Sequence, residues 1–237
     1  MSEFSDGWNR WRQQRWAAVD GEFGIAALVA THWLSTTPQA LPGLPGEWHV
    51  ERGDIVGDDL TIEAGGEALL GGVLLKHMQR DDQIALRVFD PDSPGRTSLD
   101  RIDVFPLDAE WKTHGVFTPA VDESVGIEAI DGYVQDTAVA GHVRFEIGGE
   151  SASFVVTGEG PEKFATFGDA TNGVDTYGFR FLRIRVEGDD GAAIVDFNRA
   201  YLPNCAFADG YVCPLPPASN RLHVRVPAGE RAVVRGD

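Results

Sequence analysis

Short runs of apolar residues, or of alternating apolar and polar residues, recur along the chain after residue 24 and are separated by Gly, Asp and Pro. No pattern of helix length lies between these runs, which is typical of antiparallel sheets rather than of strand–helix–strand units. The pattern therefore predicts a mainly β protein with an antiparallel sandwich or barrel-like architecture. The expected strands are 47–50, 54–56, 69–78, 83–89, 132–139, 142–147, 152–157, 179–186, 192–197 and 222–226.

The clearest local element is a hairpin at residues 142–156, HVRFEIGGESASFVV. Val143, Phe145 and Ile147 alternate with polar residues and therefore share one face of a strand. The glycines at 148–149 suit the positive φ angles of a two-residue turn. The chain is then expected to return as the second strand of the hairpin.

Residues 5–19 precede the β-rich part and have the spacing of one amphipathic helix, with Ser5 or Asp6 as its cap. One face is apolar and mainly aromatic: Phe4, Trp8, Trp11 and Val19. The other side carries arginines that we expect to face water: Arg10, Arg12 and Arg15. Two interpretations stay open, because this helix is either a strap across the β-core or an aromatic docking element for a partner protein.

Two polar stretches, 90–101 and 118–126, predict loops, and the second is the better candidate for a boundary. We therefore expect an N-terminal helix over 1–22, an N-terminal β-layer or subdomain over 23–117, and a C-terminal β-domain over 118–237. The alternative is one continuous β-domain.

The chain is acidic, with 20 Lys and Arg against 37 Asp and Glu in 237 residues and a formal net charge of −17. A field of this sign repels phosphate groups, so we expect no nucleic acid and no membrane as a partner. The N-terminus shows no secretion signal, and the apolar run at 24–34 is shorter than the roughly 20 residues that span a bilayer. We therefore expect a soluble, cytoplasmic protein with reduced cysteines.

The common catalytic motifs are absent from the sequence. It contains no G-x-S-x-G, no H-E-x-x-H and no Walker A loop, and the glycines at 158–160 lack the rest of a dinucleotide-binding motif. The segment from Asp169 begins like a calcium-binding loop, but its twelfth position is Arg180, where an EF-hand needs a bidentate Glu. We therefore expect no cofactor and no metal site.

Polar residues gather in the segment 167–182, FGDATNGVDTYGFRFL. In a structural interpretation Asp169 and Thr171 bond backbone N–H groups and stabilise an irregular loop. In a functional interpretation Tyr177 and Arg180 project from the start of a strand towards a ligand. The forked Arg180 guanidinium would suit a carboxylate or a phosphate.

A second polar cluster, DFNRAYLPNC at 196–205, ends another expected strand. Alternation places Phe197 on the core side and Asp196 on the opposite side, so an Asp196–Arg180 pair is geometrically reasonable. This pair either faces a pocket or is a buried structural pair, with Asn198 bracing the loop that follows. The two segments together predict a site for a small anionic ligand, formed by Tyr177, Arg180, Asp196 and Asn198.

Cys205 and Cys213 flank AFADGYV, and we favour two small buried thiols in this position. A disulfide would close the loop between them but does not suit a reducing compartment. A zinc site would need ligands beyond the nearby His223. Among the six histidines, His32 at the end of the apolar run is the candidate acid or base, although a core histidine is the more common identity.

The sequence resembles the bacterial family known as domain of unknown function 1684 (DUF1684). The resemblance rests on GIAALVATHWL at 24–34, LRVFDPDSPGR at 86–96, the segment 167–182, the segment DFNRAYLPNCAFADGYVCPLPPASNRL at 196–222, and AGE at 228–230. It covers most of the chain, is strongest over 164–230, and implies no activity, because none is assigned to the family. It places these residues at motif positions: Arg87, Asp90, Arg96, Asp169, Thr171, Thr176, Tyr177, Arg180, Asp196, Asn198, Cys205, Cys213, Asn220 and Glu230.

Three functions are compatible with these observations. The first, which we favour, is a binding module that holds a small anionic metabolite in the C-terminal β-domain. The second is an enzyme of unrecognised type, with His32, Asp169 or Asp196 as the acid or base and Arg180 as an electrostatic stabiliser. The third is a scaffold that docks a partner through the aromatic helix.

Overall fold

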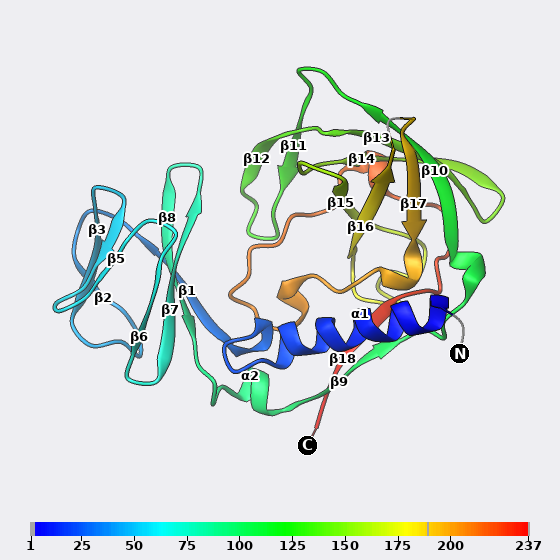
Figure 1. Cartoon of the computed structure of the whole chain (residues 1–237). Helices are drawn as coiled ribbons and strands as arrows, with labels where there is room; N and C mark the ends of the chain where they lie inside the picture. The colour runs from blue at the N-terminus through cyan, green and yellow to red at the C-terminus, as the bar shows by residue number, and fades with distance from the viewer. Residues whose placement is uncertain (1–2, 189, 237) are drawn as a thin grey trace. The chain divides into compact units, whose positions relative to one another are not determined.

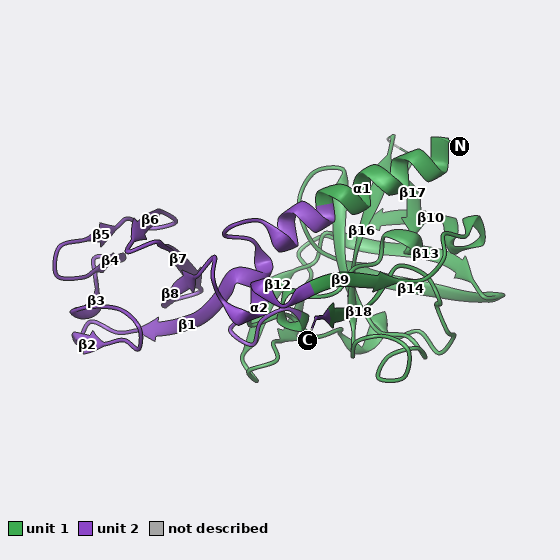
Figure 2. Cartoon of the chain, turned by 90° about the horizontal axis from the view of Figure 1, so that it is seen from below, with its two compact units in different colours: residues 1–14, 100–206, 212–234 green, residues 15–99, 207–211, 235–237 purple. Residues whose placement is uncertain are grey.

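The computed structural model describes residues 3–188 and 190–236, and its fold is mainly β, as predicted. Its sheets are antiparallel and include a half-barrel, and one long helix, α1 (Glu3–Asp20), precedes them (Figure 1). The chain forms two compact units, coloured separately in Figure 2. Unit 1 contains residues up to 14, 100–206 and 212–234, and unit 2 contains 15–99, 207–211 and the C-terminal end. The domain boundaries expected from the sequence stay a prediction.

Unit 1 is built on a six-stranded antiparallel sheet. The strands, in sheet order, are β14 (Glu150–Val156), β13 (Gly141–Ile147), β10 (Lys112–Pro119), β17 (Ala192–Asp196), β16 (Arg180–Glu187) and β15 (Glu162–Phe167). Two further pairs are β11 (Ser124–Glu128) with β12 (Val134–Ala138), and β9 (Leu99–Val104) with β18 (Glu230–Arg235). Its short helices are η2 (Ala109–Trp111), η3 (Phe197–Arg199), η4 (Asn204–Ala206) and η5 (Ala218–Asn220).

The core of unit 1 consists of side chains that alternate along these strands, with aromatic rings at its centre. Phe154 lies 4.9 Å from Phe145 and 5.6 Å from Phe167 between ring centroids, and Phe197 contacts the same group. Aromatic pairs at these separations stabilise a core beyond the area they bury. The β13–β14 hairpin is confirmed, because Ile147 pairs with Glu150 across the two turn glycines.

Unit 2 contains two four-stranded sheets. One has the order β1 (Leu28–Leu34), β8 (Gln83–Phe89), β7 (Val73–Arg80) and β6 (Glu67–Leu70). The other has the order β2 (Gln39–Ala40), β3 (Glu47–Glu51), β4 (Asp54–Val56) and β5 (Thr61–Ile62). Trp48, Ile55 and Leu86 are buried at its core. The unit also holds the short helices η1 (Ile25–Ala27) and α2 (Pro94–Thr97).

Several expected elements differ from the observed ones. The run 69–78 is two strands rather than one, because Gly71 and Gly72, with φ of 58° and 91°, turn the chain between β6 and β7. The two expected loops are only partly loops. Stretch 90–101 contains α2 and the start of β9, and stretch 118–126 contains the end of β10 and the start of β11. The alternating segment 222–226 forms no strand, because its backbone bonds the polar loop 168–170 instead, as in Leu222 N–H to Gly168 O at 2.8 Å.

Helix α1 is two residues longer at its start than expected and one residue longer at its end. Val19 is buried, and Trp8 Nε1 donates a hydrogen bond to Asn198 O at 3.0 Å. The expectation that Arg12 and Arg15 face water is wrong, because both are half-buried. The Arg12 guanidinium lies over the Trp8 ring, and that of Arg15 lies over Phe207. The guanidinium heads therefore make cation–π contacts with aromatic rings instead of facing water.

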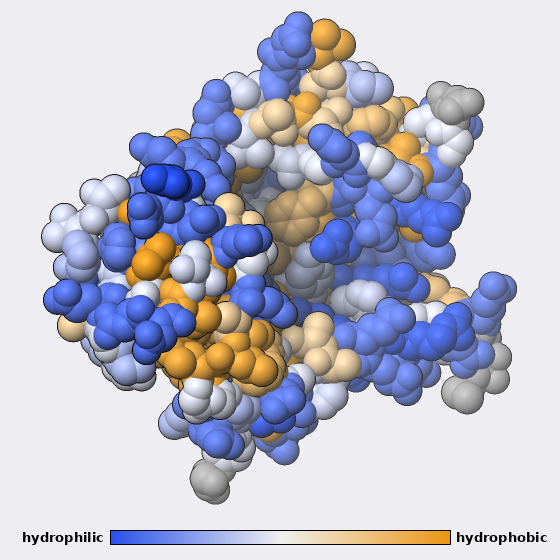
Figure 3. Space-filling model, turned by 60° about the vertical axis from the view of Figure 1, so that its left-hand side comes forward, coloured by the Kyte–Doolittle hydropathy of each residue, from blue (hydrophilic) through white to orange (hydrophobic). Residues whose placement is uncertain are grey.

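Within the described part of the chain, no helix has both the length and the apolar character that crossing a membrane requires. Figure 3 shows hydrophilic residues over much of one face, with hydrophobic residues gathered in patches between them.

Candidate functional site

Arg180, at the start of β16, is fully buried and is held by carbonyls and one carboxylate. Its Nη2 lies 2.7 Å from Asp169 Oδ2 and 2.9 Å from Val226 O, and its Nη1 donates to Ala228 O and to Glu230 O. Its Nε has no hydrogen-bond partner among the described residues. Burial lowers the pKa of Arg180, and the neighbouring Asp169 carboxylate opposes this shift. Arg180 is therefore part of the internal frame and not exposed to a ligand.

The other carboxylate oxygen of Asp169 organises the loop that follows it. Asp169 Oδ1 accepts hydrogen bonds from Thr171 N at 2.8 Å, from Thr171 Oγ1 at 2.6 Å and from Val226 N at 3.1 Å. Asn172 Nδ2 then donates to Thr176 Oγ1 and to Tyr177 O, both at 2.9 Å. This chain of hydrogen bonds fixes the backbone that presents Tyr177. Asp169 bonds backbone N–H groups as the structural interpretation expects, whereas the Thr171 hydroxyl bonds the side chains of Asp169 and Thr176.

The expected Asp196–Arg180 pair does not form. Asp196 ends β17 and caps η3, with Oδ1 accepting from Asn198 N at 3.2 Å and from Asn198 Nδ2 at 3.0 Å. Its Oδ2 lies 3.5 Å from Arg199 Nε. The register that pairs Arg185 with Ile194 sets Asp196 level with Arg183, three residues along β16 from Arg180. The nearer carboxylate of Asp169 therefore takes the arginine.

Asn198 is also engaged by the frame. Its Nδ2 donates to Asp108 O at 2.8 Å, its Oδ1 accepts from Asp108 N at 3.0 Å, and its backbone carbonyl accepts from Trp8. Asn220 ties β14 to β15 in the same way, since its side chain bonds both backbone groups of Val155 and the carbonyl of Thr166. These two asparagines satisfy backbone groups that would otherwise be buried without partners.

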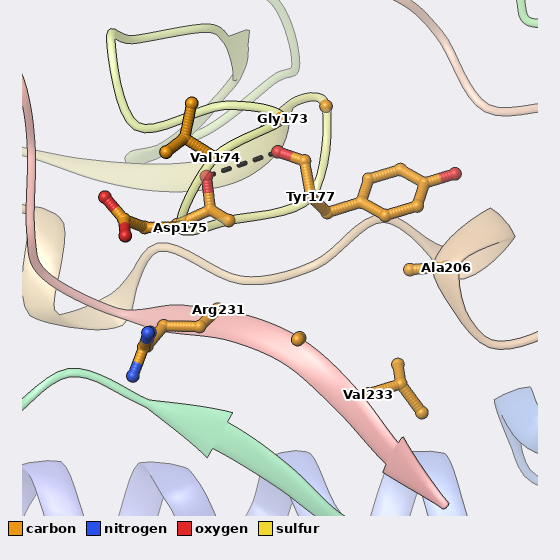
Figure 4. Close-up of a pocket in the computed structure, with 10 residues that line it drawn as sticks. Gly173, Val174, Asp175, Tyr177, Ala206, Arg231 and Val233 are labelled. Carbon is orange, nitrogen blue, oxygen red and sulfur yellow. Dashed lines mark hydrogen bonds between the residues drawn. The ribbon is translucent and has the colours of Figure 1, made fainter.

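A surface pocket of about 490 Å³ lies in unit 1 between the loop 173–178 and β18 (Figure 4). The Tyr177 N–H donates to Arg231 O at 3.0 Å and joins these two walls. In Figure 4 the Tyr177 ring points towards Ala206, which also lines the pocket, and Arg231 and Val233 project from β18. Of the four residues expected at a ligand site, Tyr177 lines this pocket, whereas Arg180, Asp196 and Asn198 do not.

The pocket carries an arginine that sequence reasoning missed. Arg231 Nη1 lies 3.2 Å from Asp103 Oδ2, its guanidinium lies over the Phe105 ring, and about a third of its side chain remains exposed. Asp175, also in the lining, is paired with Arg225. The sequence signal was weak: Arg231 directly follows the AGE motif, in the segment ERAVVR that was not recognised as a strand.

Cys205 and Cys213 are free and buried, which confirms the favoured interpretation. The Cys205 N–H donates to Cys213 Sγ at 3.3 Å, and the Tyr177 hydroxyl donates to Cys205 Sγ at 3.7 Å. A hydrogen bond from the Cys213 thiol lowers the pKa of Cys205, and the Tyr177 hydroxyl adds to this effect. The same shared proton, together with burial, raises the pKa of Cys213.

The acid or base candidates are divided between the two units. His32 lies in β1 of unit 2, whereas Asp169 and Asp196 lie in unit 1 and are both engaged by arginines. Burial lowers the pKa of His32, whose Nε2 has no hydrogen-bond partner in the part of the chain that the structure describes. Across residues 3–188 and 190–236, no group of three or more His, Cys, Asp or Glu side chains is arranged to hold a metal ion.

A search of curated proteins finds no match to this chain. A solved structure, the solution NMR structure of an uncharacterised protein of Haloarcula marismortui, is 29% identical, with 60% of this chain and 82% of that chain covered and a TM-score of 0.48. A family model described as protein of unknown function (DUF1684) matches residues 97–231, which is more than half of the 237 residues. The chain therefore belongs to the DUF1684 family.

Proposed function

We propose that the protein binds a small molecule with a carboxylate or phosphate group in the pocket between loop 173–178 and β18. The observation that carries this proposal is that a partly exposed arginine, Arg231, and a partly exposed tyrosine, Tyr177, line the same cavity. An arginine offers a fork of N–H donors to an anionic group. The tyrosine ring offers an apolar surface to the rest of the ligand.

The dimensions and the frame of the pocket support this proposal. Its volume of about 490 Å³ falls within the range of roughly 300–1,000 Å³ that is usual for small-molecule sites. Its tyrosine stands on a loop held by the buried Asp169–Arg180 pair, and its arginine stands on a strand. Sites on a rigid frame lose less conformational freedom when they bind, and the ligand therefore keeps more of its binding free energy.

The charges around the pocket also support an anionic ligand. Arg231 has five N–H donors, and its ion pair with Asp103 uses Nη1. Its partly exposed side chain still offers N–H groups to a second acceptor. The chain has a net charge of −17, so most of its surface repels anions. Arg231 places a positive charge at the pocket within this negative field.

Ligand titration of matched variants tests this proposal. Benzoate, phenyl phosphate and inorganic phosphate serve as anionic probes, and benzamide serves as the neutral control. Ala232 is exposed in β18 and lines the pocket, so Ala232→Phe should fill it without disturbing the core. Ala192→Phe is the matched control, because Ala192 is an exposed strand residue of unit 1 outside the lining.

We expect an anionic probe to raise the melting temperature of the wild type and of Ala192→Phe, but not that of Ala232→Phe. Arg231→Gln should lower the affinity about tenfold or more, since a charge-assisted hydrogen bond contributes about 1.5–3 kcal/mol. Arg183→Gln is its control, because Arg183 is an exposed unit 1 arginine in an ion pair with Glu162. Equal stabilisation of wild type and Ala232→Phe, or of wild type by benzamide and benzoate, would contradict the proposal.

A further inference from the structure

The two cysteines lie directly behind the wall of this pocket. Ala206 lines the cavity, and the preceding residue, Cys205, accepts the hydroxyl hydrogen bond of Tyr177. Both thiols are buried, with 7% of Cys205 and 5% of Cys213 exposed. Tyr177 therefore stands with its ring in the pocket and its hydroxyl on a sulfur atom.

The two sulfur atoms are also neighbours of one another. The backbone N–H of Cys205 donates to Cys213 Sγ at 3.3 Å. Seven residues separate the cysteines, and η4, which begins at Asn204, brings the first of them back towards the second. Neither cysteine belongs to a strand of the six-stranded sheet.

The pair is also asymmetric in its acidity. Two hydrogen bonds, from the Cys213 thiol and from the Tyr177 hydroxyl, lower the pKa of Cys205, while the pKa of Cys213 is raised. The thiolate is the reactive form of cysteine, so the thiol with the lower pKa is the one that reacts first with an oxidant. The asymmetry assigns the first step to Cys205.

We propose that Cys205 and Cys213 form a reversible dithiol–disulfide pair, oxidised by a hydroperoxide that reaches Cys205 from the pocket beside Tyr177. A chemically reversible disulfide is the form that cysteine oxidation usually takes in a reducing compartment. This proposal goes beyond ligand binding and does not depend on it, since its chemistry needs a peroxide and the two thiols alone.

The reaction has two steps. The Cys205 sulfur attacks one oxygen of the hydroperoxide, an S–O bond forms as the O–O bond breaks, and the leaving alkoxide takes the proton of Cys205 to become an alcohol. The Cys213 sulfur then attacks the sulfenic acid, an S–S bond forms, and the leaving hydroxide takes the proton of Cys213 to become water. Two thiols and one hydroperoxide thus yield one disulfide, one alcohol and one water, and a small dithiol reverses the change by exchange.

Peroxide titration of the full chain tests the proposal. The reduced protein is treated with hydrogen peroxide in the absence of any ligand, and its intact mass and its peptides are measured without reduction. We expect the mass of the monomer to fall by the mass of two hydrogen atoms. Peptide mapping should show a disulfide between Cys205 and Cys213, and dithiothreitol should restore both thiols. Dimers linked between chains, or stepwise addition of oxygen with no internal link, would overturn the proposal.

Single-cysteine variants test the order of the steps. In Cys213→Ser the sulfenic acid on Cys205 has no resolving thiol, so dimedone should trap it at Cys205. In Cys205→Ser the remaining Cys213 should react at least roughly tenfold more slowly than Cys205 does in Cys213→Ser, because burial still raises the pKa of Cys213. Faster labelling of Cys213 than of Cys205 would overturn the assignment.

Tyr177→Phe tests the hydroxyl contact separately from folding. Loss of one hydrogen bond to the Cys205 sulfur should slow peroxide oxidation roughly fivefold, which corresponds to about 1 kcal/mol. Tyr133→Phe, on the β11–β12 hairpin, is the control and should react at the wild-type rate. Equal rates for the wild type and Tyr177→Phe would remove Tyr177 from the proposal. These assays contain no ligand, so a negative result in them would not count against ligand binding in the pocket.

Discussion

Arg180 and Asp169 form an ion pair of 2.7 Å in which neither side chain has any exposed surface. The two charges are compensated by each other and by the backbone around them: three carbonyls accept from the guanidinium, and two N–H groups donate to the carboxylate. This pair holds together the start of β16, the loop before Tyr177 and the segment that leads to β18. The pair supports the loop and the strand that line the pocket, but neither of its residues lines the pocket.

Breaking this pair should strongly destabilise the protein. Asp169→Asn leaves the Arg180 charge buried without a counter-ion, and losing one partner of such a pair costs about 3–5 kcal/mol. Asp175→Asn is the matched control, because Asp175 lies on the same loop but pairs with Arg225 at the surface, where loss of an ion pair costs about 1 kcal/mol or less. Urea unfolding at neutral pH measures both, and similar losses in the two variants would refute the role of the buried pair.

Gly229 should tolerate no side chain. Its φ of 79° is unfavourable for other residues, and an added Cβ would lie 2.5 Å from Ala200 O and 2.8 Å from Phe197 O. Gly149 has a similar φ of 81° with open space around its Cβ position, so Gly149→Ala isolates the backbone strain, about 1–2 kcal/mol. We expect Gly229→Ala to lose roughly 3 kcal/mol or more in thermal or urea unfolding. Equal losses at the two glycines would show that the close approach at Gly229 is unimportant.

Helix α1 should contribute to stability through Trp8. Trp8→Phe retains an aromatic ring but removes the hydrogen bond to Asn198 O, which contributes about 1 kcal/mol. Arg10→Gln changes an exposed residue of the same helix and should leave the free energy of unfolding within about 0.5 kcal/mol of wild type. If Trp8→Phe unfolds like the wild type, the strap interpretation loses its main contact and a docking role gains support.

His32 should make stability depend on pH. Burial lowers its pKa below the ordinary value of 6.5, so the unfolded chain binds a proton more readily than the folded one. The contribution of neutral His32 to the free energy of unfolding is therefore fully present above pH 6.5. It is lost as the pH falls from 6.5 through the pKa of His32 in the folded state. Compared with wild type, His32→Gln should lose less free energy of unfolding between pH 7 and pH 5.

His114→Gln is the control for this pH series, because His114 is exposed in β10 and should follow the wild-type profile. An unfolding free energy whose pH dependence is the same in His32→Gln and wild type would contradict the contribution of His32.

Local elements could be predicted from the sequence, whereas long-range partners could not. The β13–β14 hairpin follows from alternation and two turn glycines, all within residues 142–156. The pairing of β9 with β18 joins segments more than a hundred residues apart, and ERAVVR has polar ends that conceal a strand. Segment 222–226 shows the opposite error: it alternates like a strand, yet its backbone bonds the polar loop instead.

At the candidate site, too, local features could be predicted from the sequence and long-range contacts could not. Alternation correctly placed Phe197 in the core, but it carries no information about which loop lies against β16. The sequence indicated Asp196 as the partner of Arg180, but the sheet register sets Asp196 level with Arg183, and Asp169 forms the ion pair instead. Tyr177 was predictable as a polar aromatic residue at a strand end, while Arg231 was hidden by its place in an unrecognised strand.

NMR mapping of a titrated probe shows whether the pocket between loop 173–178 and β18 binds an anionic small molecule. On titration with phenyl phosphate we expect saturable chemical-shift changes at residues 173–178, 206 and 231–233 and at the Arg231 Nε–H. These changes should vanish in Ala232→Phe but not in Ala192→Phe. Shift changes centred elsewhere in the chain, or changes at the pocket that persist in Ala232→Phe, would contradict binding in this pocket.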